Sequence, residues 1–121
     1  MLSKKSLLIF QDFMPNNICF GCGKNTKNGL HIKSYWNNDF AQCDWTPKNI
    51  HQGWPKIMNG GIIATIMDCH CMGTAMAYAH KMENRALGTH PEYRYATGSI
   101  KVRYILPTPN KKVVIIPSSC M

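Results

Sequence analysis

Acidic residues are scarce in this chain of 121 residues, in which 6 Asp and Glu stand against 14 Lys and Arg and the net charge is +8. A basic surface of this kind attracts anions such as nucleic acid, anionic lipid or the phosphates of a cofactor, and charge alone does not choose among them. Charged residues are few, at 17%, but the apolar fraction of 45% is ordinary for a folded protein. The composition therefore argues against a disordered chain.

The chain also lacks repeats, low-complexity tracts and a secretory signal. Lys4 and Lys5 precede only the short apolar run 7–10, which is shorter than the hydrophobic region of a signal peptide. Six cysteines would suit a secreted disulfide scaffold, but Cys69 and Cys71 fall in a stretch that has the pattern of a buried helix. We therefore predict a cytoplasmic protein with reduced thiols.

Residues 62–79 are long and apolar enough for a transmembrane span to be considered. Asp68 lies in the middle of this stretch, and His70 follows closely. Because a charge at the centre of a bilayer is costly, we predict a core helix and no membrane partner.

The segment 59–81 is predicted to be a helix that is buried on all sides. Asn59 is a good N-cap residue, and the glycines that follow tolerate the entry conformation. From residue 62 to residue 80, Asp68 is the only formally charged residue, and apolar or small residues cover nearly every direction around the axis. Such a helix needs a sheet that curls around it.

Four stretches have the pattern of β-strands. Residues 30–36 and 40–46 alternate with a period of two, and Asn37-Asn38-Asp39 between them predicts a hairpin turn. After the helix, residues 98–106 form the clearest alternating stretch, and residues 113–116 begin another. The order strand, strand, helix, strand, strand predicts an α+β fold in which helix and antiparallel sheet share one core.

The run Asn59-Gly60-Gly61, with Asp68 nine residues after Asn59, resembles a motif of the hotdog-fold acyl-CoA thioesterases, phenylacetyl-CoA thioesterase type. Three flanking segments support the resemblance: residues 19–30, 51–55 and 97–107. The resemblance covers roughly residues 18–110. It implies a hotdog domain over residues 18–121, after a lead-in of residues 1–17, with an antiparallel sheet wrapped around a central helix. The implied activity is hydrolysis of an acyl-CoA thioester, with no cofactor because coenzyme A is part of the substrate.

The chain departs from the family pattern in two places. Asn59 stands where the family has His, and only one short strand fits after Pro109 where the family continues with two long ones. The resemblance therefore implies truncated C-terminal strands and an open sheet edge. A hotdog protein that binds acyl-CoA without hydrolysing it is the main alternative.

The resemblance also implies roles for the candidate site residues. Asp68 would be the general base or the nucleophile, and the N–H of Gly60 or Gly61 would stabilise the oxyanion at the positive end of the helix dipole. Thr97 would hold the attacking water, and Asn59 would bind the thioester carbonyl. Plainer roles remain open: a structural Asp68 bonded to backbone or to a neighbouring His, an ordinary strand Thr97 and a simple N-cap at Asn59.

In this fold, two subunits usually join their sheets edge to edge, and the site lies between them. The resemblance thus implies a homodimer or homotetramer in which Asp68 of one subunit faces the Gly60 end of the other. Four basic residues are candidates for binding the phosphates of coenzyme A, with a solvated basic face as the alternative: Lys81, Arg85, Lys101 and Arg103.

Cys19 and Cys22 have the spacing of half a zinc site. A second half is missing, because Cys69, His70 and Cys71 diverge around a helix. Cys43 and His31 are conceivable partners. We predict no metal ligand and no nucleic-acid partner, since the chain lacks aromatic and basic residues interleaved at strand spacing. A small basic module that binds zinc and nucleic acid is the remaining alternative.

Overall fold

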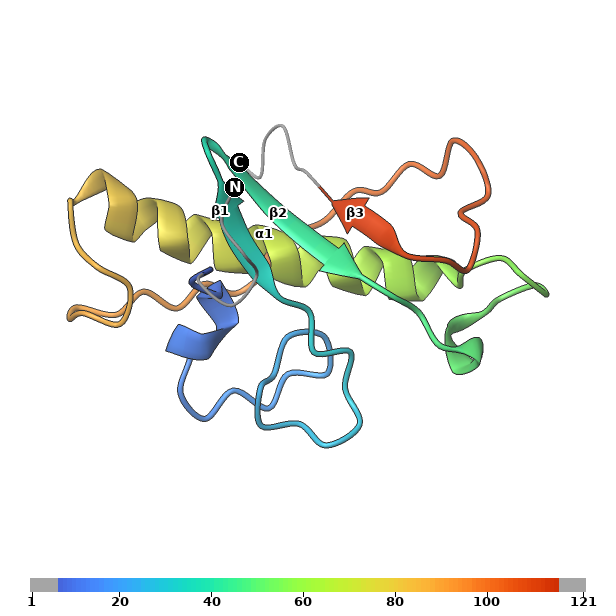
Figure 1. Cartoon of the computed structure of the whole chain (residues 1–121), viewed down its shortest axis with the longest axis horizontal. Helices are drawn as coiled ribbons and strands as arrows, with labels where there is room; N and C mark the ends of the chain where they lie inside the picture. The colour runs from blue at the N-terminus through green and yellow to red at the C-terminus, as the bar shows by residue number, and fades with distance from the viewer. Residues whose placement is uncertain (1–6, 116–121) are drawn as a thin grey trace.

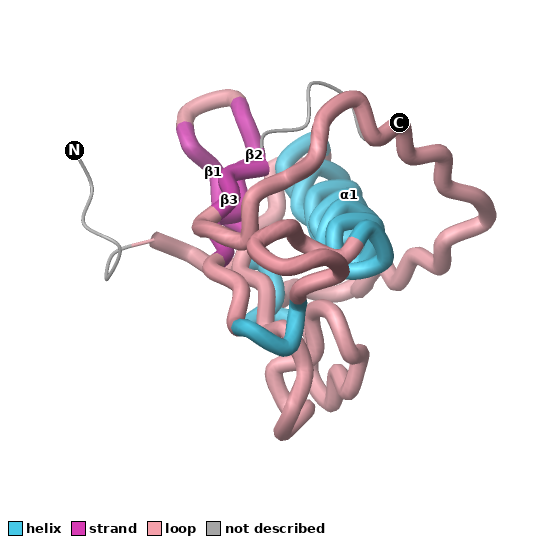
Figure 2. Tube along the Cα trace, turned by 90° about the vertical axis from the view of Figure 1, so that its right-hand side faces the viewer, coloured by secondary structure: helices cyan, strands magenta, loops and turns pink. Residues whose placement is uncertain are grey.

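The structure, a computed structural model, describes residues 7–115 and confirms the predicted α+β class. Its one α-helix in this range is α1 (Gly60–Met82), and its sheet has the antiparallel strand order β1-β2-β3. The strands are β1 (Ser34–Asn37), β2 (Phe40–Trp45) and β3 (Val113–Ile115), and two short 3-10 helices are η2 (Phe10–Phe13) and η3 (Asn49–His51). Figures 1 and 2 show that the sheet lies on one side of α1.

The predicted hairpin is present, with Ser34 opposite Cys43 and Asn37 opposite Phe40. Asn38 adopts a positive φ of 56° at the turn, a conformation that Asn tolerates better than most residues. β1 begins four residues later than the alternating pattern predicts. Over residues 30–33 the chain instead lies against the turn at residues 19–23, and the N–H groups of Leu30 and Ile32 donate to carbonyl oxygens there, at 2.7 and 3.1 Å.

The strand predicted over residues 98–106 is wrong, because this segment is coil. Alternation alone does not make a strand; a partner must bond its backbone, and β3 rather than this segment pairs with β2. In Figure 1 the orange coil after α1 runs back along the helix. Its apolar side chains remain at least half exposed at Ile100, Tyr104, Ile105 and Leu106.

Both ends of α1 match the sequence prediction. The Asn59 side chain caps the start, because its Oδ1 accepts hydrogen bonds from the N–H groups of Gly61 (2.7 Å) and Ile62 (3.2 Å). At the other end, the Glu83 N–H donates to the carbonyl oxygens of Ala79 and His80. The plain N-cap role of Asn59 is therefore confirmed.

Burial of α1 on all sides is a wrong prediction. The buried residues follow one another at intervals of one or three positions and form a single stripe: Ile66, Cys69, His70, Gly73, Met76, Ala77 and His80. Other apolar positions are half-buried, and Tyr78 and Met82 are 53% and 63% exposed. Three short strands cover only one face of a 23-residue helix, since residues 98–106 add no fourth strand.

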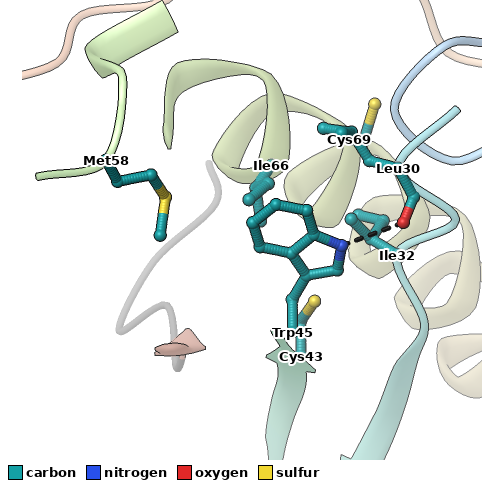
Figure 3. Close-up of a cluster of buried hydrophobic side chains, with 7 residues drawn as sticks. All are labelled: Leu30, Ile32, Cys43, Trp45, Met58, Ile66 and Cys69. Carbon is teal, nitrogen blue, oxygen red and sulfur yellow. Dashed lines mark hydrogen bonds between the residues drawn. The ribbon is translucent and has the colours of Figure 1, made fainter. Parts of the chain in front are cut away.

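The main core cluster lies between the sheet and the first half of α1 (Figure 3). Trp45 fills its centre, packs against Ile66 and donates from Nε1 to the Leu30 carbonyl oxygen at 2.9 Å. A second cluster joins Phe10, Ala41, Met76 and Ala77. Phe10 is fully buried there, so the predicted lead-in contributes a core side chain.

α1 has 23 residues, and an 18-residue stretch of it has a mean hydropathy of 1.2, so its length and composition would also suit a membrane span. The core helix of a soluble protein meets the same criteria. The absence of a membrane partner therefore stays a prediction.

Replacing Asn59 with Ala should lower the free energy of unfolding by about 1 kcal/mol, because two N–H groups of the first turn lose their acceptor. Asn59→Asp keeps an acceptor oxygen and adds a negative charge at the positive end of the helix, so its stability should equal that of the wild type. Urea unfolding followed by circular dichroism measures both. Equal losses in the two variants would contradict the capping role.

Candidate functional site

A cavity of about 480 Å³ lies along one face of α1. Its walls come from three parts of the chain: residues 13–22, the middle of α1 and the coil at residues 88–97. Met72 and Met76 of α1 line it with flexible thioether side chains that adapt to apolar ligands. The cavity also contains Asp68 and Thr97, two of the predicted site residues.

Asp68 is half-buried in the cavity wall. The exposed Thr97 donates a hydrogen bond from its Oγ1 to the Oδ1 of Asp68. Among residues 7–115, Thr97 is the hydrogen-bond donor to the Asp68 carboxylate. The alternative in which Asp68 bonds to His70 is not found: among residues 7–115, no hydrogen bond joins the two side chains, and Nδ1 of His70 pairs with Ser34 Oγ at 2.7 Å. One carboxylate oxygen is thus held in place by a hydroxyl from a different segment.

The glycine entrance of α1 lies away from this cavity. Gly60 precedes Asp68 by eight residues, which corresponds to about 12 Å along a helix. The N–H of Gly61 is occupied by the Asn59 side chain, and the Tyr104 hydroxyl donates to the Gly60 carbonyl oxygen at 2.7 Å. Within residues 7–115, no hydrogen-bond acceptor meets the Gly60 N–H. Within one chain, the predicted oxyanion donors Gly60 and Gly61 therefore do not lie next to the predicted base, Asp68.

The basic residues predicted to bind phosphate lie in different settings. Arg85 donates to the Glu83 carboxylate at 3.0 Å and to the Thr89 carbonyl and hydroxyl oxygens, so its guanidinium holds the turn after α1 together. Lys81 lies over the Trp36 ring, with Nζ 4.6 Å from the ring centroid. Lys101 and Arg103 are exposed on the coil.

Arg94 is a basic residue of the cavity that sequence reasoning missed. Its guanidinium lies 3.8 Å from the Glu92 carboxylate. It sits in the charged loop after α1, where no periodic pattern marks it, so no sequence signal would have singled it out.

Three thiols of the cavity wall lie close together. The Sγ atoms of Cys19, Cys22 and Cys69 all lie within 4.8 Å of one another, and those of Cys19 and Cys69 are 3.6 Å apart. Sequence reasoning paired Cys19 with Cys22 but placed Cys69 elsewhere, because it is 50 residues from Cys19. The spacing of Cys19 and Cys22 was the only signal for this cluster.

The thiols affect one another's protonation. A hydrogen bond from Cys69, aided by others from Asn17 and Cys19, lowers the pKa of Cys22 to about 6. The same bond to Cys22, with burial, raises the pKa of Cys69. The lowered pKa favours the thiolate form of Cys22, which is the form that acts as nucleophile or metal ligand.

A buried polar network in the core was also missed. Gln11 donates from Nε2 to Ser34 Oγ at 3.0 Å and accepts from the Ser34 N–H at 2.7 Å, and His70 completes the chain of bonds. Burial lowers the pKa of His70, which favours the neutral imidazole. These bonds join η2 and β1 to α1 and pair the buried polar atoms of Gln11 and Ser34.

Comparisons with known proteins identified no relative: no protein-family model, no curated protein and no solved structure matches the chain.

Proposed function

We propose that the chain is an acyl-CoA thioesterase with a hotdog fold and that Asp68 is its catalytic carboxylate. The observation that carries the proposal is the position of Asp68 in the wall of a cavity of about 480 Å³, with Thr97 bonded to its Oδ1. A carboxylate buried in an apolar helix for packing alone would be costly, whereas one at a cavity can meet substrate and water.

The hydroxyl of Thr97 orients the carboxylate for general-base chemistry. Because Oδ1 of Asp68 is engaged by Thr97, Oδ2 is the oxygen that accepts the proton of an attacking water. The Met72 and Met76 side chains beside it provide an apolar wall for an acyl group. This arrangement supports the roles that the family resemblance implies for Asp68 and Thr97.

The oxyanion donor is proposed to come from a second copy of the chain. The Gly60 N–H is the available donor at the start of α1, and it lies too far from Asp68 to serve the same substrate within one chain. Exposed apolar side chains along residues 100–106, with Leu106 77% exposed, support burial against another subunit. A homodimer would bring the two halves of the site together.

Coenzyme A would bind through the exposed cations of the same coil. Lys101 and Arg103 are proposed to contact its phosphates, whereas Arg85 is already bonded within the turn after α1. A cytoplasmic location, where acyl-CoA substrates occur and thiols stay reduced, accompanies this proposal.

The test is hydrolysis of a panel of aliphatic and aromatic acyl-CoAs by the purified full chain. Loss of the ultraviolet absorbance of the thioester should be used, because a thiol reagent would also react with the exposed Cys19. We expect saturable turnover well above the spontaneous rate for at least one acyl class. Saturable binding without turnover would support the non-catalytic alternative, and neither binding nor turnover would overturn both.

A further inference from the structure

We propose that Cys19, Cys22 and Cys69 bind one zinc ion in the wall of the cavity. Cys19 and Cys22 come from the turn at residues 19–23, and Cys69 comes from α1, so the ion would link two segments that are far apart in the sequence. This inference does not depend on thioester hydrolysis, because it concerns different side chains and has its own readout.

The spacing of the three sulfur atoms suits a tetrahedral ion. With Zn–S bonds of about 2.3 Å, two thiolates of a tetrahedral site lie about 3.8 Å apart. The Cys19 and Cys69 Sγ atoms are 3.6 Å apart, and all three Sγ atoms lie within 4.8 Å of one another. Small rotations of the side chains would therefore complete the site without a change in the backbone.

Asn17 orients the two cysteines of the turn. Its Oδ1 accepts from the Cys19 N–H at 2.9 Å, and its Nδ2 lies 3.4 Å from the Cys22 Sγ, to which it donates. The Gly23 N–H closes the turn on the Cys19 carbonyl oxygen at 2.8 Å. Hydrogen bonds to ligands are the usual support of a metal site, because they fix the ligand atoms in position before the ion arrives.

Gly21 lets the turn approach α1 closely enough for Cys69 to join it. A Cβ atom at this position would lie 2.4 Å from the Cys69 Sγ and 2.9 Å from Cγ2 of Thr65. Any side chain here would push the third thiol away. The absence of a side chain at Gly21 therefore allows the three sulfur atoms to converge.

The chemistry of the donors favours zinc over harder ions. Thiolates prefer soft or borderline metals, and a site with three protein ligands leaves a fourth position for water or another ligand. All three cysteines line the cavity, so the fourth position would face it. The bound ion would also stabilise the fold, because the three thiols converge on one point in the folded chain.

The experiment measures zinc in the purified, reduced full chain by elemental analysis and by cobalt substitution. We expect one zinc per chain, a thiolate-to-cobalt charge-transfer band with Co²⁺, and a rise in melting temperature on adding Zn²⁺ to metal-free protein. Cys19→Ser should lower zinc affinity at least tenfold without unfolding the chain, because Cys19 is exposed. Cys22→Ser and Cys69→Ser should have the same effect on zinc.

Two further variants make the test specific. Asn17→Ala keeps all three thiols and should weaken zinc binding by about 10–100-fold, as loss of supporting hydrogen bonds does elsewhere. Cys71→Ser, on the same helix but outside the cluster, should retain one zinc per chain. The proposal is overturned if the reduced protein binds no stoichiometric zinc, if Cys19→Ser binds zinc as tightly as the wild type, or if the thiols form only a disulfide.

Discussion

Substituting Asn for Asp68 is expected to lower kcat for acyl-CoA hydrolysis by about 10²–10⁴-fold, the range typical for loss of a general acid or base. The amide has nearly the same shape as the carboxylate and can still accept the hydrogen bond from Thr97, but it cannot take a proton from water. Steady-state rates on the best acyl-CoA of the panel, with substrate affinity measured separately, test this expectation.

Variants of Thr97 separate orientation from proton transfer. Thr97→Ser keeps the hydroxyl and should retain most of the activity, whereas Thr97→Val keeps the shape, removes the donor to Oδ1 and should give a loss smaller than that of Asp68→Asn. Unfolding curves of all three variants should resemble that of the wild type, because Thr97 is exposed and Asp68 is half-buried at the cavity. Wild-type turnover in Asp68→Asn would end the catalytic assignment.

Replacing Trp45 with Ala should cost about 3–5 kcal/mol of unfolding free energy, the largest loss expected from one side chain of this core. The indole fills the centre of the main core cluster, is 8% exposed and satisfies the buried Leu30 carbonyl oxygen. Its removal leaves a cavity between the sheet and α1 together with an unpaired carbonyl group. Chemical denaturation followed by circular dichroism gives the value.

Two matched variants make the Trp45 result interpretable. Trp45→Phe keeps an aromatic ring but loses the 2.9 Å bond to Leu30, so about 1–3 kcal/mol of loss is expected in addition to the smaller ring volume. Trp54→Ala removes an indole that is 79% exposed and should change stability by less than about 0.5 kcal/mol. Similar losses in Trp45→Ala and Trp54→Ala would contradict the location of the core.

The proposed base and the proposed zinc ligands share one cavity, and Asp68 directly precedes Cys69 on α1. The two proposals can nevertheless fail separately. Asp68→Asn should lower kcat by about 10²–10⁴-fold and leave the zinc content unchanged, whereas Cys19→Ser should release zinc, whatever its effect on turnover. Measuring both quantities in both variants shows which assignment holds.

Several features of this protein were set by local sequence signals. The start of α1 follows from the side chain of Asn59 and from the glycines after it, and the hairpin follows from Asn38 between two alternating stretches. Both signals act through hydrogen bonds and dihedral preferences of residues that are neighbours in the chain. They needed no information about distant segments, and for that reason the sequence alone was enough.

Other features were decided only by tertiary packing. Residues 98–106 have strand periodicity, but without a strand to pair with they remain coil, and α1 is consequently buried on one face only. The bond between Thr97 and Asp68 spans 29 residues, and the contact between Cys19 and Cys69 spans 50. Contacts at such separations depend on how the whole chain closes its loops and fills its core, and periodicity and motif spacing do not carry that information.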